Sequence, residues 1–403
     1  MKNAFVACEY NPFHNGHKYH LDEIKASGFD NIICIMSGNF VQRGEAALFE
    51  KHKRAELALK NGADLVIELP LKYAVSTASL FADGFVKTAK STGIEGSISF
   101  GAENDINTLL RIKDIIFSTG AEEYCCEKIR EGINYPNAKQ EYLTKTMGTE
   151  YADILSDGNN TLGLEYIRAR DLYFPSAGLF AVKRNSIAHD SDETDSIYAS
   201  ASYLRKLVYG TAEKEQMTDI IAGFIPENCV SEIEMLFEKG LFPRDLTKFE
   251  AAAMSRLVLM TAEDFLTINN VKEGLENRIT DAVRVSSSTS EVLYNVKTKR
   301  FTYSRLRQIL INAVLGITKA DIENGISYIR VLGFNDKGRQ LLNEMRGKSL
   351  IPVICNLSEI NKNDSFMQRD ALLDYNAGKL FSLTHPTCVS GNHEYNIPPV
   401  YVK

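Results

Sequence analysis

Near its start the chain reads Ala4-Phe5-Val6-Ala7-Cys8-Glu9-Tyr10-Asn11-Pro12-Phe13-His14-Asn15-Gly16-His17. The apolar run 4–8 predicts a buried strand, Asn11-Pro12 predicts a turn, and a helix is expected over 17–26. The same order of strand, turn and helix then repeats. Further strands are predicted at 31–36, 64–69, 96–101 and 179–182, and further helices at 51–61 and 76–92. Apolar strands that alternate with helices are typical of a parallel sheet covered on both faces. We therefore predict an α/β fold in which residues 1–205 form a first domain with a Rossmann-like parallel sheet.

After about residue 205 the pattern changes to helices. Apolar residues at helical spacing predict helices at 200–209, 228–239, 248–260, 261–268, 276–282 and 303–315. We predict that residues 206–403 form a mainly helical C-terminal domain that ends in a short tail. The segment 327–403 contains a short apolar strand at 351–355, and the sequence leaves open which domain it packs against.

The composition excludes several classes of protein. The chain has 403 residues, of which 44% are apolar and 24% charged, so it is a globular protein of two or three domains and not a disordered chain. No apolar run approaches the roughly 18 residues of a membrane span, and Glu9 interrupts the first apolar run too early for a signal peptide. The seven cysteines form no C-x-x-C motif, which indicates reduced thiols and no cysteine-based metal site. We expect a cytoplasmic protein with no membrane association, no protein-held metal and no stable protein partner.

Charge is distributed unevenly along the chain. The net charge is −6, yet residues 251–403 hold 19 lysines and arginines against 15 aspartates and glutamates. A polyanion should therefore meet the C-terminal part, although a solvated helical surface would show a similar excess.

The motif His14-Asn15-Gly16-His17 lies between the first strand and the first helix. Two imidazoles beside the free amides of a helix start suit a triphosphate, and Gly16 lets a nucleotide approach the backbone. Simple capping of the helix by the two histidines is the alternative. A zinc site is less favoured because no third ligand has suitable spacing, with His20 one turn beyond His17.

This H-x-G-H sequence resembles the signature of the nucleotidylyltransferase and class I aminoacyl-tRNA synthetase superfamily. That superfamily carries a second motif near S-S-T-x-x-R, which the run 199–205 fits loosely. Ser202 would supply a hydroxyl and Arg205 a cation for the phosphates. A capping serine followed by a surface arginine is the competing interpretation.

A closer resemblance covers nearly the whole chain. The blocks at 9–17, 37–44, 62–70, 100–103, 159–166 and 299–302 are similar to the tRNA(Met) cytidine acetate ligase family. The resemblance implies an enzyme that condenses acetate with ATP to acetyl-adenylate, releases pyrophosphate, and passes the acetyl group to N4 of the wobble cytidine of elongator tRNA(Met). Mg²⁺ is expected as the companion of ATP from general ATP chemistry. Residues 1–205 would then be the ATP-binding nucleotidylyltransferase domain and residues 206–403 the RNA-binding domain.

The resemblance assigns site residues, position by position. The catalytic residues are expected to be His14, His17, Ser202 and Arg205. The ATP site is expected to comprise Ala7, Cys8, Glu9, Tyr10, Asn11, Pro12, Phe13, His14, Asn15, Gly16, His17, Lys18, Tyr19, His20, Gly101, Asn160 and Arg184.

Several of these positions are also compatible with a purely structural role. Gly101 could belong to an ordinary turn, Asn160 could cap a helix that begins at 161, and Arg184 could be an exposed strand end. Lys51 and Arg54 share a helical face and could bind pyrophosphate or RNA, but a solvated face is favoured.

The best RNA-binding candidate is the segment 297–307, which has five cations and two aromatic residues. Such a segment can bind phosphates and stack an unpaired base, although a basic helix start would look the same. The residues concerned are Lys297, Lys299, Arg300, Phe301, Tyr303, Arg305 and Arg307.

Two other functions stay open at this stage. A nucleotidylyltransferase that adenylylates a small metabolite would account for the first half of the chain, and a nucleotide-sensing RNA-binding protein would need no chemistry.

Overall fold

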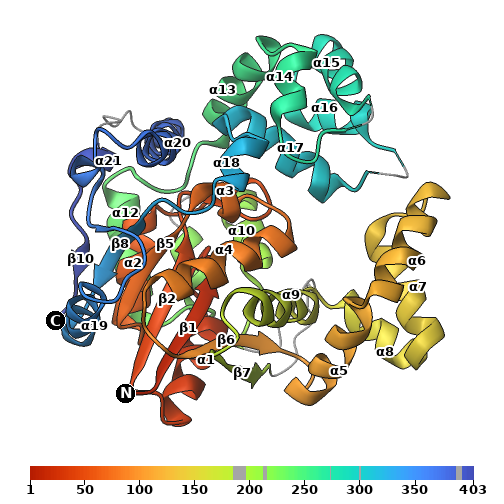
Figure 1. Ribbon diagram of the computed structural model, residues 1–403. Helices are drawn as coiled ribbons and strands as arrows, with labels where there is room; N and C mark the ends of the chain where they lie inside the picture. Colours follow the sequence, from red (N-terminus) through yellow and green to blue (C-terminus); the bar gives the residue numbers. More distant parts are fainter. Residues whose placement is uncertain (185–196, 212–215, 273, 299–300, 387–392) are drawn as a thin grey trace.

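A mainly parallel sheet forms the centre of the molecule (Figure 1). The computed structural model describes residues 1–184, 197–211, 216–272, 274–298, 301–386 and 393–403. Five strands pair in parallel in the order β7-β6-β1-β2-β5. Their bounds are β1 (Asn3–Cys8), β2 (Asn31–Ser37), β5 (Leu65–Leu69), β6 (Ser97–Ala102) and β7 (Gly178–Lys183). The predicted α/β fold is confirmed.

Helices cover both faces of the sheet because successive strand residues point to opposite sides. Phe5 and Ile33 pack on one face against residues of α4 (Ala78–Ser91), α5 (Ile106–Ile116) and α9 (Gly158–Tyr173). Val6 and Cys34 pack on the other face. There they meet α1 (Asn15–Ala26), α2 (Lys51–Lys60), α10 (Ala201–Gly210), α11 (Met217–Ala222) and α12 (Glu227–Glu238).

The C-terminal segment packs back on this sheet, which answers the question that the sequence left open. Strand β8 (Ile329–Phe334) pairs antiparallel with β5, and β9 (Val353–Ile354) and β10 (Val400–Tyr401) pair parallel with β8. Helices α19 (Asp336–Met345), α20 (Ser365–Ser382) and α21 (His393–Asn396) complete the segment. The sheet and its core thus extend across the predicted boundary at residue 205.

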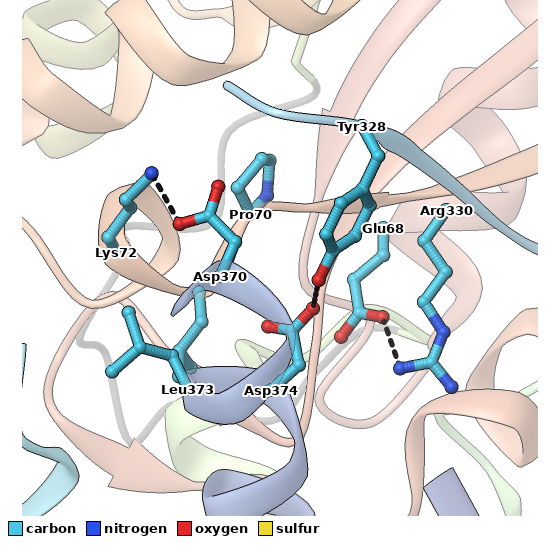
Figure 2. A pocket seen from close by; sticks show the side chains of 9 residues that line it. Glu68, Pro70, Lys72, Tyr328, Arg330, Asp370, Leu373 and Asp374 are labelled. Carbon is cyan, nitrogen blue, oxygen red and sulfur yellow. Dashed lines mark hydrogen bonds and ion pairs between the residues drawn. The ribbon is translucent and has the colours of Figure 1, made fainter. Parts of the chain in front are cut away.

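Buried polar contacts join this segment to the sheet. The Nζ of Lys72 lies 2.6 Å from Oδ1 of Asp370, and the hydroxyl of Tyr328 donates to Asp374 over 2.5 Å (Figure 2). Lys72 follows β5 in α3 (Leu71–Ala74), whereas both aspartates belong to α20. The end of the chain is therefore part of the same folded unit as β5.

A lobe of helices with its own core follows α12. Leu257, Phe265 and Ile279 are buried at its centre, and Figure 1 places it above the sheet. Its helices are α13 (Leu246–Val258), α14 (Ala262–Thr267), α15 (Leu275–Val285), α16 (Thr289–Val296) and α17 (Tyr303–Leu315), after which α18 (Lys319–Glu323) leads to β8. The mainly helical character of the part after the first domain is confirmed.

Two further insertions interrupt the regular pattern. Helices α5, α6 (Thr119–Arg130), α7 (Tyr135–Met147) and α8 (Thr149–Asp153) lie between β6 and α9, and α6 to α8 project away from the sheet (Figure 1). These helices were not predicted from the sequence. A small hairpin of β3 (Phe40–Val41) and β4 (Glu45–Ala46) follows β2 and packs against Ile311 and Leu315 of α17.

None of the helices in the described ranges combines the length and the apolar character that a membrane span requires.

Candidate active site

A pocket lies at the carboxyl ends of the central strands. The chain runs from β1 to β2 on one side and later returns to the other side of β1 as β6, so the strand order reverses at β1. Ligands of open α/β sheets bind at such a reversal. The described residues that line this pocket are His14, Gly16, His17, Tyr19, His20, Gly101, Val182, Arg184, Tyr198, Ala199 and Ser200.

The two histidines of the motif are held by the start of helix α1. His14 is the N-cap, and its Nδ1 accepts a hydrogen bond from the backbone N–H of Gly16 over 3.1 Å. The Nδ1 of His17 accepts from the N–H of His14 over 3.3 Å, and the two rings stack with centroids 3.6 Å apart. Because each Nδ1 is an acceptor, a neutral ring carries its hydrogen on Nε2. Capping and ligand binding are thus compatible, since they use opposite edges of the same rings.

Gly16 is required by this arrangement for a steric reason. A Cβ at position 16 would lie 3.0 Å from Cε1 of His14 and 3.1 Å from its Nδ1. Any larger residue would therefore displace the ring that caps the helix.

The pocket keeps His17 and His20 neutral near pH 7. Burial, together with His14, Arg184 and His20, holds the pKa of His17 well below its usual value. Burial and Arg184 lower the pKa of His20 to about 4, and its Nε2 lies 3.1 Å from the hydroxyl of Ser99. Near neutral pH the pocket therefore offers neutral imidazole donors, and Arg184 supplies its positive charge.

The depressed pKa of His20 predicts a loss of stability in acid. The pKa of an unfolded histidine is about 6.5, so between that pH and about 4 the unfolded chain binds a proton that the folded protein excludes. The free energy of unfolding should fall as the pH drops through this window, by up to about 1.4 kcal/mol per pH unit from this one group. Urea unfolding from pH 7.5 to 4.5 should show a smaller decline for His20→Gln. Parallel curves for the two proteins would contradict the assignment.

Arg184 and Gly101 come from neighbouring strand ends. Arg184 follows β7, its Nε lies 3.5 Å from Oε1 of Glu103, and its side chain is 39% exposed. A Cβ at Gly101 would lie 3.3 Å from Cγ and Cδ of Arg184. Glycine at 101 therefore leaves room for the arginine, so the two residues depend on one another.

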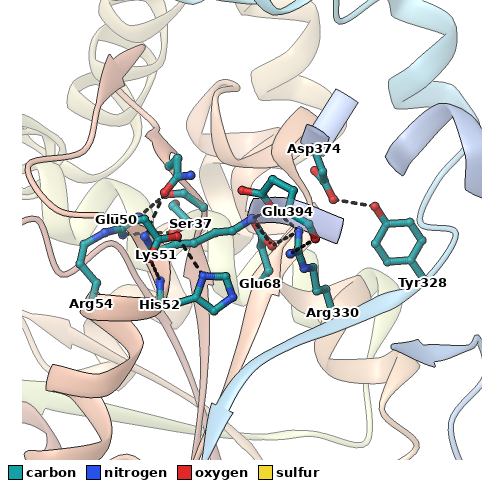
Figure 3. Close-up of polar contacts among 12 residues, drawn as sticks. Ser37, Glu50, Lys51, His52, Arg54, Glu68, Tyr328, Arg330, Asp374 and Glu394 are labelled. Atoms are coloured by element: carbon teal, nitrogen blue, oxygen red, sulfur yellow. Dashed lines mark hydrogen bonds and ion pairs between the residues drawn. The ribbon is translucent and has the colours of Figure 1, made fainter. Parts of the chain in front are cut away.

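Arg54, which is fully buried, holds the loop that precedes the motif in place through hydrogen bonds. Its guanidinium donates to the carbonyl oxygens of Glu9 (2.5 Å), Ser37 (3.1 Å), Phe49 (3.0 Å) and Gly38. Figure 3 shows this side chain beside the end of β2. The expectation of a solvated face was wrong for Arg54, because four backbone carbonyls need a buried donor there.

Lys51 is also buried, with 2% of its side chain exposed. Its Nζ binds carboxylates of Glu68 and Glu394 and not solvent. The solvated face expected for this lysine was therefore wrong as well.

Ser202 and Arg205 lie on α10, which contacts the loop that precedes the H-x-G-H motif. The N-cap of α10 is Ser200, so Ser202 is not the capping serine. Arg205 donates from Nη1 to the carbonyl oxygen of Asn11 over 2.9 Å, and its Nη2 lies 3.5 Å from Ser202 Oγ. Among the residues described, neither belongs to the lining of the histidine pocket. Their catalytic role stays a prediction.

Asn160 supports the site indirectly. Its side chain is buried, its Oδ1 accepts from the N–H groups of Glu103 (3.1 Å) and Asn104 (3.4 Å), and its Nδ2 donates to Asn104. The cap of helix α9 is Asp157, so Asn160 does not begin a helix. Asn160 orders the loop that follows β6, and contact with a nucleotide stays a prediction.

The other residues of the run 7–20 divide by environment. Tyr10 and Phe13 are buried and pack edge-on or tilted against the ring of His17, with centroids 4.9 and 5.6 Å away. Glu9 accepts from the N–H of Gln42 over 2.8 Å, and Lys18 forms an ion pair with Asp22 at the surface. Tyr10 and Phe13 therefore help to position His17, and contact of the run 7–20 with ATP stays a prediction.

Four lining residues were not assigned to the ATP site from the sequence: Val182, Tyr198, Ala199 and Ser200. Ala199 and Ser200 begin the run 199–205 that was compared with the second motif, and Val182 ends the predicted strand 179–182.

Comparisons with known proteins agree with this geometry. Residues 1–395 match the family described as HIGH Nucleotidyl Transferase. The chain belongs to this family. Within it, the chain is 35% identical over 397 residues to the tRNA(Met) cytidine acetate ligase of Acetivibrio thermocellus, covering 96% of this chain and 95% of the relative. It is 37% identical over 382 residues to the protein of the same name from Thermoanaerobacter sp., covering 91% and 92%. The resemblance to the tRNA(Met) cytidine acetate ligases is confirmed.

The fold is also that of a solved member of the family. The structure of Thermotoga maritima TmcAL bound with alpha-thio ATP matches with a TM-score of 0.89 and 31% identity, over 100% of this chain and 99% of that one. The apo form of the same protein matches with a TM-score of 0.90 over 100% of both chains.

The pocket does not fit a magnesium ion held by the protein. The described lining of this HIGH-family pocket contains no carboxylate, and carboxylates with phosphates are the usual ligands of Mg²⁺. In the described part of the chain, no three His, Cys, Asp or Glu side chains gather as metal ligands.

The described residues of the segment expected to bind RNA have different partners. Lys299 and Arg300 lie outside the described residues. The Nζ of Lys297 lies 5.4 Å from the ring centroid of Tyr303, and the guanidinium of Arg305 lies 5.1 Å from that of Phe301. Arg307 instead lies 3.9 Å from Glu45, the carboxylate that Arg205 also approaches. RNA binding by these residues stays a prediction.

Proposed function

We propose that this protein activates acetate with ATP and transfers the acetyl group to N4 of the wobble cytidine of elongator tRNA(Met), in the cytoplasm. The observation that carries the proposal is the pair of stacked imidazoles at the start of α1. Their Nδ1 atoms accept the hydrogen bonds of the capping box, and both residues line the pocket at the β1–β6 reversal. The relative bound with alpha-thio ATP supports ATP as that ligand.

In the first step an acetate oxygen attacks the α-phosphorus of ATP. The bond from that phosphorus to the oxygen that bridges the α- and β-phosphates breaks, and this oxygen leaves with the pyrophosphate, so the products are acetyl-adenylate and pyrophosphate. His14 and His17 donate from Nε2–H to phosphate oxygens, and Arg184 balances the charge that develops there. Neutral donors suit this role because no proton must move during the attack.

We place the departing pyrophosphate near Ser202. Its hydroxyl lies 3.3 Å from Nη1 of Arg43 and 3.5 Å from Nη2 of Arg205. Arg205 and Arg307 both approach the same carboxylate, that of Glu45. Two guanidinium groups, those of Arg43 and Arg205, thus lie beside this serine, and guanidinium groups favour a highly charged anion.

In the second step the exocyclic amine of the cytidine attacks the acetyl carbonyl carbon. The bond from that carbon to the adenylate oxygen breaks, the amine loses a proton, and AMP leaves. An anticodon base must be unstacked to reach the adenylate. Mg²⁺ would accompany ATP through its phosphates, and no protein-held metal is assigned to the reaction.

Two measurements test the proposal together. Exchange of labelled pyrophosphate into ATP should require acetate and proceed without tRNA. Nucleosides from tRNA incubated with the enzyme, ATP and acetate should then contain N4-acetylcytidine. ADP and phosphate as products would contradict attack at the α-phosphorus. Exchange without any tRNA product would favour adenylylation of a small metabolite, and the absence of both would favour a protein that only senses nucleotides.

A further inference from the structure

A second cavity lies between the helical insertion and α17. It has a volume of about 500 Å³, within the range of roughly 300–1,000 Å³ that is usual for ligand pockets. It is formed by the beginnings of α4, α7 and α17, the end of α5, part of α9, and residues 270 and 272. None of its lining residues belongs to the histidine pocket.

The electrostatics of this cavity favour an anion. The N-cap residues of three helices line it, namely Thr77 of α4, Asn134 of α7 and Thr302 of α17. Helix starts attract negative charge through their free N–H groups and dipoles. The lining also contains three cations, Lys139, Lys272 and Arg305, against a single carboxylate among the described residues, that of Glu165. Glu165 is already engaged, because Arg168 donates to it over 2.7 Å.

Lys139 points to the same conclusion independently of the helix starts. It is 8% exposed, and its Nζ makes no hydrogen bond to any described residue. The nearest carboxylate oxygen, of Glu165, is 3.8 Å away, and the rings of Phe117 and Tyr135 have centroids at 3.9 and 4.8 Å. Burial lowers the pKa of this lysine. A buried ammonium group with three donors has a strong need for an acceptor.

The remaining lining suits a flat apolar group beside the anion. Phe117, Leu155 and Leu164 contribute apolar surface, and Tyr135 presents a ring that is 44% exposed. A nucleotide combines a planar base with a phosphate, through its sugar. Exposed aromatic rings beside cations are a common surface for unpaired bases of RNA.

The cavity is also linked to the motif loop. Gln308, which lines it, donates from Nε2 to the carbonyl oxygens of Ser76 (2.9 Å) and Gln42 (3.3 Å). The N–H of Gln42 in turn donates to Glu9. An RNA that occupies the cavity would therefore contact Gln308, which is linked through Gln42 to Glu9 in the loop before the motif.

We propose that this cavity binds one nucleotide of the RNA substrate, with its phosphate among Lys139, Lys272 and Arg305 and its base against Tyr135. The inference rests on the proposed function, because it assumes that RNA is the substrate.

Three single variants test it: Lys139→Gln, Lys272→Gln and Tyr135→Leu. Binding of transcribed elongator tRNA(Met) is measured over a series of KCl concentrations. Each lysine variant should lower the slope of log K against log salt by about one. Loss of the stacking ring should weaken binding between about 5-fold and 150-fold. The matched control is Lys145→Gln, on the same helix with a side chain that is 56% exposed, which should bind tRNA like the wild type.

Pyrophosphate exchange without tRNA reports whether each variant is folded. It also separates a failure of the cavity inference from a failure of the proposed function. Loss of tRNA affinity with normal pyrophosphate exchange supports binding of RNA in the cavity. Wild-type affinity and salt slope in all three variants would overturn it while leaving the proposed function intact. Failure of wild-type protein to bind tRNA would overturn both. If Lys139→Gln does not fold, Lys272→Gln and Tyr135→Leu decide, since both residues are exposed. A variant that loses ATP affinity instead of tRNA affinity would assign the cavity to the free nucleotide and overturn the inference.

Discussion

His14→Asn and His17→Gln should each lower acetate-dependent ATP–pyrophosphate exchange by about 10²–10³-fold, the usual cost of losing one preorganised donor to a developing charge. In both variants the Nε2–H of the imidazole is removed from the pocket at the start of α1. The loss should fall on kcat, because the donor is needed most when charge builds up on the phosphates.

These two substitutions are chosen because they keep the helix start intact. His14 and His17 form a reciprocal capping box, and loss of an N-cap typically costs about 0.5–2 kcal/mol of stability. Asparagine is a strong N-cap, and glutamine at the third helical position can complete the box. The melting temperature should therefore change little, whereas alanine at either position would combine the loss of the cap with the loss of catalysis.

Lys25→Gln is the matched control, an exposed lysine in the last turn of the same helix. Its exchange rate should equal that of the wild type. Wild-type exchange in both histidine variants would show that the imidazoles only cap the helix.

The sheet could be predicted from sequence because its strands are buried on both faces. Runs such as Ile32 to Met36 are continuously apolar, and each ends in a polar turn before a helix. In globular proteins this pattern is typical of parallel sheets, whose two faces are both covered by helices. The histidine pocket could be predicted for the same reason, since the carboxyl end of β1 is where an α/β sheet binds its ligands.

The C-terminal strands could not be placed in this way. Strand β10 has two residues, Val400 and Tyr401, and pairs with β8, which lies more than sixty positions earlier. A short strand carries too little pattern to specify a distant partner, because its pairing depends on tertiary packing.

The burial of charged residues was the other feature that could not be predicted from the sequence. Lys51 and Arg54 lie on a helix that looks solvated from its sequence, yet both side chains are buried. Lysine and arginine are almost never fully buried unless they are paired. Here the partners are four carbonyl oxygens and two carboxylates from distant segments, and a single sequence does not reveal such partners.

Those carboxylates form a buried ion cluster whose disruption should have the largest effect on stability. The Nζ of Lys51 lies 2.9 Å from Glu68 Oε1 and 2.8 Å from Glu394 Oε2. Arg330 lies 2.6 Å from Glu394 and 3.6 Å from Glu68 (Figure 3). Two cations thus face two carboxylates, and each of these four side chains is at most 6% exposed.

The charges of the cluster depend on one another. Burial and the charge of Arg330 lower the pKa of Lys51. The carboxylates of Glu394 and Glu68 raise it by more, so the pKa of this lysine is higher than usual. Burial raises the pKa of nearby Asp374 to about 7, with Glu68 adding to the shift. A second uncompensated carboxylate in this region would therefore be costly.

Lys51→Met should lower the free energy of unfolding by about 3–5 kcal/mol, because it leaves Glu68 and Glu394 buried with one cation between them. The matched control is Lys348→Met, which breaks the surface pair with Glu344, where the lysine side chain is 56% exposed. That change should cost no more than about 1 kcal/mol. Urea unfolding at pH 7.5 measures both.

The double variant Lys51→Met with Glu394→Gln separates the loss of a pair from the burial of an unpaired charge. It removes one charge of each sign and leaves Arg330 with Glu68, so its loss of stability should be smaller than the sum of the two single losses. Additive losses would mean that the two side chains do not interact. If Lys51→Met lowered stability no more than the surface control does, the ion cluster would contribute nothing to holding α21 and β8 against the sheet. The attachment of the C-terminal segment would then depend on β8–β5 pairing and apolar packing alone.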